Sequence, residues 1–386
     1  MPLPPGLADA VQERFPRYLA ELSALVGIDS GSYTPAGVNR VADSVTASLA
    51  ELGAAVERIA AGNGAPQVGD LVVGRLPGEG PRVLLIGHMD TVFDPGTAAE
   101  RPFTVRDRRA LGPGTSDMKG GLLAGLHALA ALQSAGLRPN ATFVANPDEE
   151  IGSPFSTPII RQLAGEHDAA LVLECARANG DIVSARKGIA DLLATFTGRA
   201  AHAGVEPEKG RSAILAAARR VVALHELNGR WPTVTLNAGV IQGGTRPNVV
   251  AAECRVRLDL RAATATEFET AAAEVERIVA EAATEGVAAA VQRIAFHPPM
   301  ERSPAAGRLA DLARAVAAEI GFAVNETLTG GASDANTTAA AGVPTLDGLG
   351  PVGGDDHSAD EWLDLDSVVP RTTMLAGLLA RIGEAL

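Results

Sequence analysis

The chain has 386 residues, with 33 basic and 46 acidic side chains and a formal net charge of −13. This acid excess, without any basic stripe, argues against a nucleic-acid partner. Apolar residues make up 46% of the chain, which predicts a folded protein, and the length predicts more than one domain. The sequence shows neither a signal-peptide pattern nor a uniformly apolar run of about 18 residues, so we expect a cytoplasmic protein without a membrane partner.

The first part of the chain alternates between helix and strand patterns. Apolar spacing predicts a helix over about the first 25 residues. Farther along it predicts, in order, a helix over 37–53, strands over 69–75 and 82–87, a helix over 118–134, and strands over 142–146 and 169–174. Strands that alternate with helices indicate an α/β domain with a mostly parallel sheet.

The middle of the chain has a different order of elements. It predicts strand 189–197, helix 211–228, strands 233–241 and 249–260, helix 266–285 and strand 288–295. This β-α-β-β-α-β order is that of a ferredoxin-like α+β unit. The first pattern then returns, with a helix over 308–320 and another after Pro370. We therefore expect a large domain of residues 1–186 and 298–386, with residues 187–297 inserted as a small domain.

Side chains of the kind that bind metals follow several predicted strands of the large domain, where each strand ends. In chain order they are His88 with Asp90, then Glu149 with Glu150, then Glu174, and finally His357 in a Gly/Asp loop. A further acid, Asp117, stands just before the helix over 118–134. The carboxyl ends of strands in an open α/β sheet meet along one crevice, so we expect these side chains to converge.

Each of these motifs alone has an ordinary structural interpretation. Asp117 suits a helix N-cap or a turn, and His357 suits a surface loop. Glu149 and Glu150 together suit a solvated acidic pair. Glu174 is different, because a carboxylate after the apolar run ALVL is costly to bury unpaired.

Taken together, two histidines and several carboxylates fit a site for two metal ions. Zinc binds histidine nitrogen and carboxylate oxygen, and a pair of metals needs a bridging ligand with acids on both sides. One more acid must stay off the metals to take a proton from the attacking water. Glu149 and Glu150 suit this division, because neighbouring residues tend to point in different directions. The HExxH motif of helical zinc proteases does not occur in the sequence.

Eight strings of the sequence resemble, in order and along nearly the whole chain, those of the M20 metallopeptidases. The strings are GHMDTVFD, GPGTSDMKGG, NPDEEIGS, LVLECAR, AAHAG, TRPNVV, GGASDAN and DDHSADEW. The resemblance is closest to the glutamate carboxypeptidase branch, with aminoacylases and acetylornithine or succinyl-diaminopimelate deacylases as relatives. It implies a zinc-hydrolase catalytic domain, an inserted lid and dimerisation domain, and hence a homodimer.

The resemblance also implies a role for each matching residue. His88 and Glu174 would bind the first metal, and Glu150 and His357 the second. Asp117 would bridge the two metals. The implied cofactor is two Zn²⁺ ions, which Co²⁺ or Mn²⁺ could replace.

Three further residues would be catalytic if the resemblance holds. Glu149 would be the general base and then the acid that protonates the leaving amine. Asp90 would orient His88 and fix its tautomer. His202, in the small domain, would reach into the partner subunit's site and stabilise the oxyanion.

A carboxypeptidase must also hold the free carboxylate of its substrate, which arginine does best by bidentate pairing. The candidates in or beside the small domain are Arg186, Lys187, Arg246 and Asn248, with the backbone N–H groups around Gly331 as a further possibility. Each of the charged candidates alone suits a solvated surface equally well. Two positions depart from the family pattern: His297 stands where the branch tends to carry Arg before a Pro pair, and Cys175 stands where Pro is frequent. The first departure weakens the case for glutamate as the favoured terminal residue.

These observations predict a di-zinc hydrolase that cleaves the amide bond of N-acyl or N-peptidyl amino acids in the manner of a carboxypeptidase, with terminal glutamate as one candidate product. An aminoacylase or N-acyl amino acid deacetylase is the first alternative, and it differs in pocket shape, which the sequence does not specify. A non-catalytic protein that binds amino-acid conjugates is the second. That class is expected to lose the base or a ligand, and this sequence keeps every such position.

Overall fold

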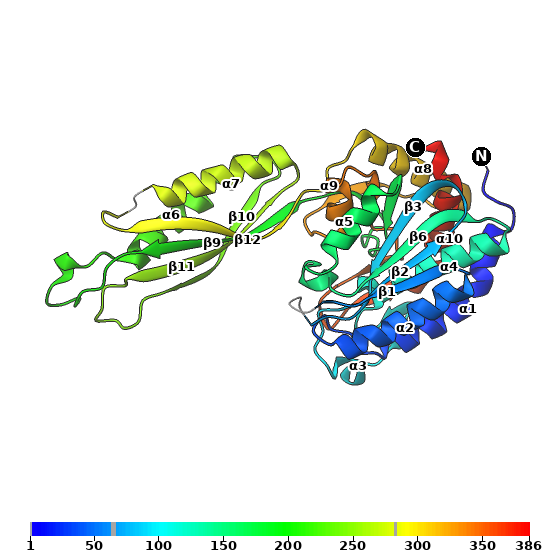
Figure 1. Ribbon diagram of the computed structural model, residues 1–386, viewed down its shortest axis with the longest axis horizontal. Helices are drawn as coiled ribbons and strands as arrows, with labels where there is room; N and C mark the ends of the chain where they lie inside the picture. Colours follow the sequence, from blue (N-terminus) through cyan, green and yellow to red (C-terminus); the bar gives the residue numbers. More distant parts are fainter. Residues whose placement is uncertain (1, 63–66, 282–283) are drawn as a thin grey trace. The chain divides into compact units, whose positions relative to one another are not determined.

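The computed structural model describes residues 2–62, 67–281 and 284–386 and divides into two compact units. The first unit comprises Met1–Ser184, Arg302–Thr327 and Ser333–Leu386, and the second comprises Ala185–Glu301 and Leu328–Ala332. The sequence colours of Figure 1 show that the second unit is built from the middle of the chain. Among the described residues, no helix combines the length and the apolar character that a membrane crossing requires.

A six-stranded sheet forms the centre of the first unit, in the order β1-β2-β6-β3-β7-β14. Its strands are β1 (Ala55–Ile59), β2 (Leu71–Leu76), β3 (Glu79–His88), β6 (Pro139–Asn146), β7 (Ala169–Val172) and β14 (Thr345–Leu346). β6, β3, β7 and β14 run parallel to one another, whereas β2 pairs antiparallel with both β1 and β6. The predicted α/β fold with a mostly parallel sheet is confirmed.

Helices pack against this sheet and against one another to form the core of the first unit. Their bounds are α1 (Leu7–Val26), α2 (Pro35–Glu51), α4 (Gly120–Ser134), α5 (Thr157–Gly165), α8 (Pro304–Ile320), α9 (Asp334–Ala340) and α10 (Leu365–Arg381). α1, α4 and α10 contact one another, α8 contacts α10, and α9 contacts β7 and β14 (Figure 1). α4 is apolar on all sides, and its residues Gly120 to Leu132 are all buried. A helix of that composition is stable only inside a core.

A small sheet lies beside the main one in the first unit, in the order β15-β16-β5-β4. Its strands are β4 (Thr104–Arg106), β5 (Arg109–Leu111), β15 (Gly353–Gly354) and β16 (Trp362–Asp364), and a short helix, α3 (Thr97–Glu100), precedes it. All of its pairings are antiparallel. This sheet joins the segment before Asp117 to the segment around His357, which are far apart in the sequence.

The second unit is a four-stranded antiparallel sheet with two helices. The strand order is β10-β11-β9-β12, with β9 (Gly188–Thr197), β10 (Thr235–Gly243), β11 (Glu253–Ala262), β12 (Ala288–His297), α6 (Ala213–His225) and α7 (Ala265–Ala280). The predicted β-α-β-β-α-β order is thus observed. Residues 282–283 of the helix expected over 266–285 lie outside the described residues. A two-stranded pairing of β8 (Ile182–Arg186) with β13 (Glu326–Thr329) stands where the chain passes between the units.

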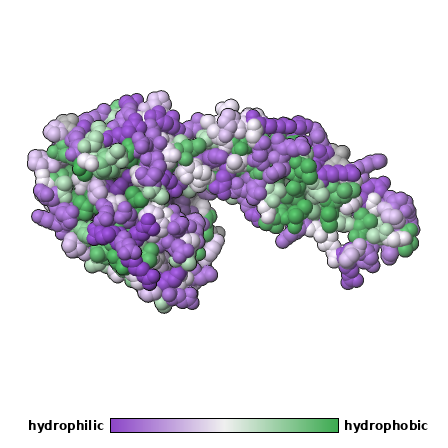
Figure 2. All heavy atoms as spheres, turned by 180° about the vertical axis from the view of Figure 1, so that it is seen from behind, coloured by the Kyte–Doolittle hydropathy of each residue, from purple (hydrophilic) through white to green (hydrophobic). Residues whose placement is uncertain are grey.

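The sheet of the second unit has one covered and one exposed face. Buried and less buried residues alternate along β9 and β11, as expected for strands with helices on one side only. Several large apolar side chains of this unit remain exposed: Val205, Ile214, Leu215, Val222, Val240, Ile241 and Ile294. Figure 2 shows apolar surface gathered on the visible face of this unit.

Some elements differ from their prediction. α10 begins at Leu365 rather than after Pro370, because the Asp364 side chain caps it by accepting a hydrogen bond from the Asp366 N–H at 2.9 Å. Pro370 therefore lies inside the helix. α4 begins at Gly120 rather than at residue 118, because Asp117 and Met118 have non-helical torsion angles. Strand β1 and helix α5 are not anticipated by the sequence patterns.

Candidate metal centre

Parallel strands bring the predicted ligands to one edge of the main sheet. β3 ends at His88 and β6 ends at Asn146, and these two residues lie side by side in the parallel register. Glu149 follows on the turn after β6, and Glu174 lies two residues beyond the end of β7. The expected convergence at the carboxyl ends of the strands is therefore observed.

The carboxylate of Asp117 lies between two histidines. Its Oδ1 is 3.0 Å from His88 Nε2, and its Oδ2 is 3.0 Å from His357 Nε2. Each histidine has a second carboxylate nearby: Glu174 Oε1 is 3.7 Å from His88 Nε2, and Glu150 Oε2 is 3.1 Å from His357 Nε2. The five side chains form two nitrogen–carboxylate groups that share Asp117.

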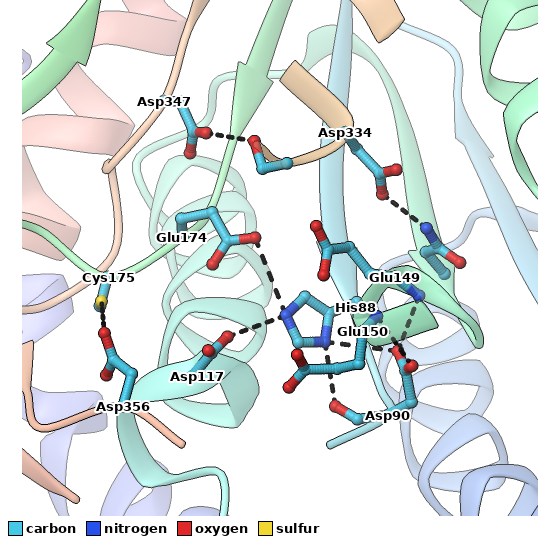
Figure 3. A network of polar contacts seen from close by, with 12 residues as sticks. His88, Asp90, Asp117, Glu149, Glu150, Glu174, Cys175, Asp334, Asp347 and Asp356 are labelled. Carbon is cyan, nitrogen blue, oxygen red and sulfur yellow. Dashed lines mark hydrogen bonds and ion pairs between the residues drawn. The ribbon is translucent and has the colours of Figure 1, made fainter. Parts of the chain in front are cut away.

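Glu149 and Glu150 occupy different places in this cluster. His88, Glu149 and Glu174 can bring ligand atoms within 4.8 Å of one another, and so can His88, Asp117 and Glu150. Figure 3 shows the two glutamates leaving one turn and approaching the His88 ring from different sides. Because only Glu150 contacts His357, the two acids are not equivalent.

Asp90 holds the turn that carries the two glutamates. Its Oδ1 accepts the Glu149 N–H and its Oδ2 accepts the Glu150 N–H, each at 3.1 Å. The Ser32 hydroxyl donates to Oδ2 at 2.6 Å. His88 Nδ1 lies 3.0 Å from the Asp90 carbonyl oxygen and 3.4 Å from its Oδ1 (Figure 3). Asp90 thus faces the ring nitrogen of His88 that points away from Asp117 and also fixes the backbone of Glu149 and Glu150.

The carboxylates create a strongly negative environment around both histidines. Burial lowers the pKa of His88, but hydrogen bonds with Asp117 and Asp90 outweigh burial and raise that pKa well above its ordinary value. Hydrogen bonds with Asp117 and Glu150 raise the pKa of His357 to about 11. Such a field favours positive charge at the centre, whether carried by protons or by cations.

Glu149 has the environment of a proton acceptor with a raised pKa. Burial raises the pKa of its carboxyl well above the usual range, and the nearby charges of Glu174 and Asp334 raise it further, against the opposing effect of His88. A carboxylate whose pKa lies closer to neutrality is a better general base and a better general acid.

Comparison with known proteins places the chain in a family. The model of peptidase family M20/M25/M40 matches residues 84–381. The chain belongs to this family. Over 383 residues it is 30% identical to carboxypeptidase G2 of Pseudomonas sp. (strain RS-16), a match that covers 98% of this chain and 92% of that protein. Over 266 residues it is 30% identical to acetylornithine deacetylase of Myxococcus xanthus, covering 65% of this chain and 68% of that protein.

Solved structures confirm the M20 fold. The crystal structure of a tripeptidase from Staphylococcus aureus subsp. aureus Mu50 superposes with a TM-score of 0.81 at 22% identity, covering 96% of this chain and 99% of that one. At this identity the likeness concerns the fold alone. With the family match over residues 84–381, the chain is an M20 metallohydrolase.

The donor atoms of this M20 centre fit divalent metal ions. They are imidazole nitrogens and carboxylate oxygens, which are the ligands that zinc, cobalt and manganese accept. Several carboxylates at close range, with Glu174 only 8% exposed, are costly to ionise together without compensating cations. His88 and Glu174 would hold one ion and Glu150 and His357 the other, with Asp117 between them.

The loop that carries His357 has an unusual backbone. Asp355 and His357 have positive φ angles, of 56° and 63°, in the left-handed region that favours glycine. The Asp356 carboxylate accepts a hydrogen bond from the Ser116 hydroxyl, next to Asp117. The side chain of His357 is 56% exposed. The loop thus keeps a solvent-accessible histidine directed at a half-buried carboxylate.

The remaining predicted site residues lie in the second unit. His202 is exposed, and its Nδ1 accepts the Gly204 N–H at 3.2 Å. Arg246 and Asn248 are exposed and Lys187 is half-buried. Arg186 is buried, and its guanidinium donates to the Gly331 carbonyl at 3.1 Å. The structure describes these residues within their own unit, so their proposed contacts with substrate stay predictions.

Several polar residues at this edge are not anticipated by the sequence patterns. Asn146 donates to Asp334 at 2.6 Å and to Ser153 at 2.9 Å, and Ser153 donates to Asp334 at 2.7 Å. Burial raises the pKa of Asp334 to about 6, against the effect of these hydrogen bonds. Glu361 is a second buried acid, 1% exposed, close to the segment around Asp117. The one sequence feature that could have pointed to Glu361 as a site residue is its position four residues after His357.

Proposed function

We propose that the chain is a di-metal amidohydrolase that cleaves N-acyl or N-peptidyl amino acids, with Glu149 as the general base. The observation that carries this proposal is the Asp117 carboxylate between His88 and His357, with Glu149 held beside it but not in contact with His357. This arrangement provides separate ligands for two ions and leaves one acid for proton transfer. Family membership and the similarity to carboxypeptidase G2 support the same class of reaction.

The reaction follows from what each side chain can do. Two divalent cations, when bound, would polarise the scissile carbonyl and lower the pKa of a water molecule. Glu149 takes one proton from the attacking water, whose oxygen bonds to the carbonyl carbon. Glu149 then gives that proton to the amide nitrogen as the C–N bond breaks, which leaves a carboxylic acid and an amine. Asp90 keeps the Glu149 backbone in place throughout.

His202 is proposed to stabilise the oxyanion of the tetrahedral intermediate. The proposal rests on the AAHAG string and on family resemblance, and it requires His202 to come from the second subunit of a homodimer. A donor aimed at the developing charge contributes on the order of 3 kcal/mol to transition-state stabilisation.

We propose carboxypeptidase-type substrates, in which the released amino acid carries a free carboxylate. Lys187, Arg246 and Asn248 are proposed to bind that group. A deacetylase acting on a simple N-acyl amino acid is the second candidate, because the chain is also 30% identical to acetylornithine deacetylase of Myxococcus xanthus. His297, which stands where the glutamate carboxypeptidase branch tends to carry Arg, favours that second candidate.

A hydrolysis panel on the zinc-loaded protein tests the proposed function. The panel contains N-acetyl amino acids, dipeptides, and benzoyl- or folate-linked glutamates, and Glu149→Gln is the control. We expect turnover of at least one class, and a loss of at least about a hundredfold in Glu149→Gln with metal content unchanged. Preference for aroyl or peptidyl glutamate supports the carboxypeptidase form, and preference for N-acetyl amino acids supports the deacetylase form. Full activity of Glu149→Gln would remove Glu149 as the base.

A further inference from the structure

Glu361 is a buried acid to which neither the motifs nor the proposed reaction assigns a task. It is 1% exposed, and among the described residues no lysine or arginine forms an ion pair with it, although its charge acts on the buried Lys119 from farther away. A buried carboxylate of this kind is unfavourable unless hydrogen-bond donors surround it. What surrounds Glu361 therefore indicates what it does.

The donors are three backbone N–H groups of one short segment. Glu361 Oε2 accepts the Gly114 N–H at 2.9 Å. Its Oε1 accepts the Ser116 N–H at 2.8 Å and the Asp117 N–H at 3.1 Å. Both oxygens are thus used on the segment that ends at the residue shared by His88 and His357.

This segment forms a single irregular turn, closed by a hydrogen bond from the Lys119 N–H to the Gly114 carbonyl at 3.0 Å. Asp117 has φ −114° and ψ 92°, and the regular helix α4 begins only at Gly120. The Gly114, Ser116 and Asp117 N–H groups lie before this helix and take no part in its hydrogen-bond ladder. The carboxylate of Glu361 supplies the acceptors that the segment itself does not have.

Strand pairing brings Glu361 to this place. Trp362, the first residue of β16, lies opposite Leu111, the last residue of β5. Glu361, just before β16, and the segment just after β5 therefore lie at the same end of this strand pair. The small sheet links the two segments across 244 positions between Glu361 and Asp117.

We propose that Glu361 is a positioning residue of the metal centre, which fixes the backbone of Gly114, Ser116 and Asp117 so that the Asp117 carboxylate stays between His88 and His357. The proposal rests on the proposed function, because it assumes that this carboxylate bridges two metal ions. Glu361 acts through Asp117 and touches neither metal nor substrate. Its effect is on metal affinity and on the geometry of the bound ions.

Cobalt binding tests this proposal without any activity measurement. The probe is Co²⁺ alone, titrated into the metal-free full-length protein against a competing chelator, with the visible spectrum recorded at saturation. Glu361→Gln keeps the size of the side chain but turns one acceptor into a donor that faces a backbone N–H. We expect a 10- to 100-fold weaker affinity for Co²⁺ and a changed visible spectrum, as is typical when a partner of a metal ligand is altered.

Asp29→Asn is the matched control. Asp29 also accepts two backbone N–H groups, those of Gly96 and Ala98 at 2.8 Å each, but it does not contact the ligand segment. We expect this variant to bind Co²⁺ with the affinity and spectrum of the unaltered chain. Thermal unfolding of each metal-free variant, followed by circular dichroism, separates loss of fold from loss of positioning. If Glu361→Gln does not fold, Glu361→Asp, which keeps the carboxylate, replaces it in the same titration.

The outcomes distinguish the two proposals. Failure of the unaltered chain to bind two Co²⁺ ions would overturn the proposed function and the role of Glu361 with it. Two ions bound by the unaltered chain, with an affinity in the Glu361 variant reduced less than threefold and an unchanged spectrum, would overturn the positioning role alone. An equal loss of affinity in Asp29→Asn would do the same.

Discussion

At the scale of single residues, Asp90 connects three parts of the first unit through one side chain. Its carboxylate accepts hydrogen bonds from Ser32, Glu149 and Glu150, and it faces His88 at the end of β3. It is 0% exposed, so none of these contacts is exchanged for water. Family resemblance gives Asp90 the task of orienting His88. The structure adds that the same carboxylate fixes the turn that carries Glu149.

Asp90→Asn should therefore weaken more than one property at once. The amide keeps a single acceptor oxygen and places an NH₂ group against a backbone N–H. We expect metal affinity and kcat/KM to fall by about 10- to 100-fold, and stability to fall by about 1–3 kcal/mol. Zinc content, kinetics and urea unfolding measure the three effects.

Ser32→Ala is the graded control for that experiment, because it removes only the hydroxyl that donates to Asp90. We expect a smaller loss, below about tenfold in kcat/KM. Should Ser32→Ala cost as much as Asp90→Asn, the contacts of Asp90 with the glutamate turn would carry none of the effect.

At the scale of elements, the residues that follow strands are predictable from the sequence, whereas Glu361 is not. His88, Glu149 and Glu174 follow apolar runs that read as parallel strands, so their convergence is predictable from local patterns. Glu361 is not predictable in this way, because its partners lie 244 to 247 positions away and are backbone groups with no sequence signature. The start of α10 is missed for a local reason, since Pro370 is a stronger visible signal than the cap at Asp364.

The ion pairs of Glu326 predict how the stability of the chain changes in acid. Glu326, at the start of β13, is bound by Arg302 at 2.7 and 2.9 Å and by Arg314 at 3.1 Å. The Arg302 hydrogen bonds are the main reason that the pKa of Glu326 falls to about 2. Because the folded pKa lies below the unfolded one, the stabilisation is complete above about pH 5 and is lost as the pH falls toward 2.

Glu326→Gln should accordingly destabilise the chain near neutral pH by about 1 kcal/mol, a value reduced for the partly exposed arginines. The difference from the unaltered chain should shrink steadily between about pH 5 and pH 2. Urea unfolding at a series of pH values measures it. Glu57→Gln, in the exposed pair with Arg75, is the control and should change stability little at any pH. A pH-independent difference for Glu326→Gln would contradict the assigned cause.

At the scale of the whole molecule, the open question is how many chains make one active site. The second unit exposes large apolar side chains on α6, β10 and β12, among them Val222, Ile241 and Ile294. Apolar surface of this kind often marks an interface between chains. It agrees with the proposed homodimer, in which His202 would serve the site of the partner subunit.

Subunit mixing tests that proposal. Glu149→Gln and His202→Asn should each be nearly inactive alone, with metal content retained. Mixed dimers would have one site with an intact Glu149 and an intact His202 from the other chain, so random reassociation should restore about one quarter of full activity. Sedimentation of the mixture checks that dimers form. No restoration in mixed dimers of two inactive variants would mean that His202 acts within its own chain, and an active His202→Asn variant would remove its catalytic role.

The three-segment construction of the first unit also sets an order of events during synthesis. His88, Asp117, Glu150 and Glu174 belong to its first segment, whereas His357 and Glu361 belong to its last, after the whole second unit. A nascent chain on the ribosome therefore carries its acidic ligands long before it has the second histidine or the carboxylate that holds Asp117. Until the last segment docks, the site lacks His357 and the hydrogen bonds that Glu361 accepts from the segment around Asp117. Under the proposed function, metal loading and completion of the fold would therefore depend on each other.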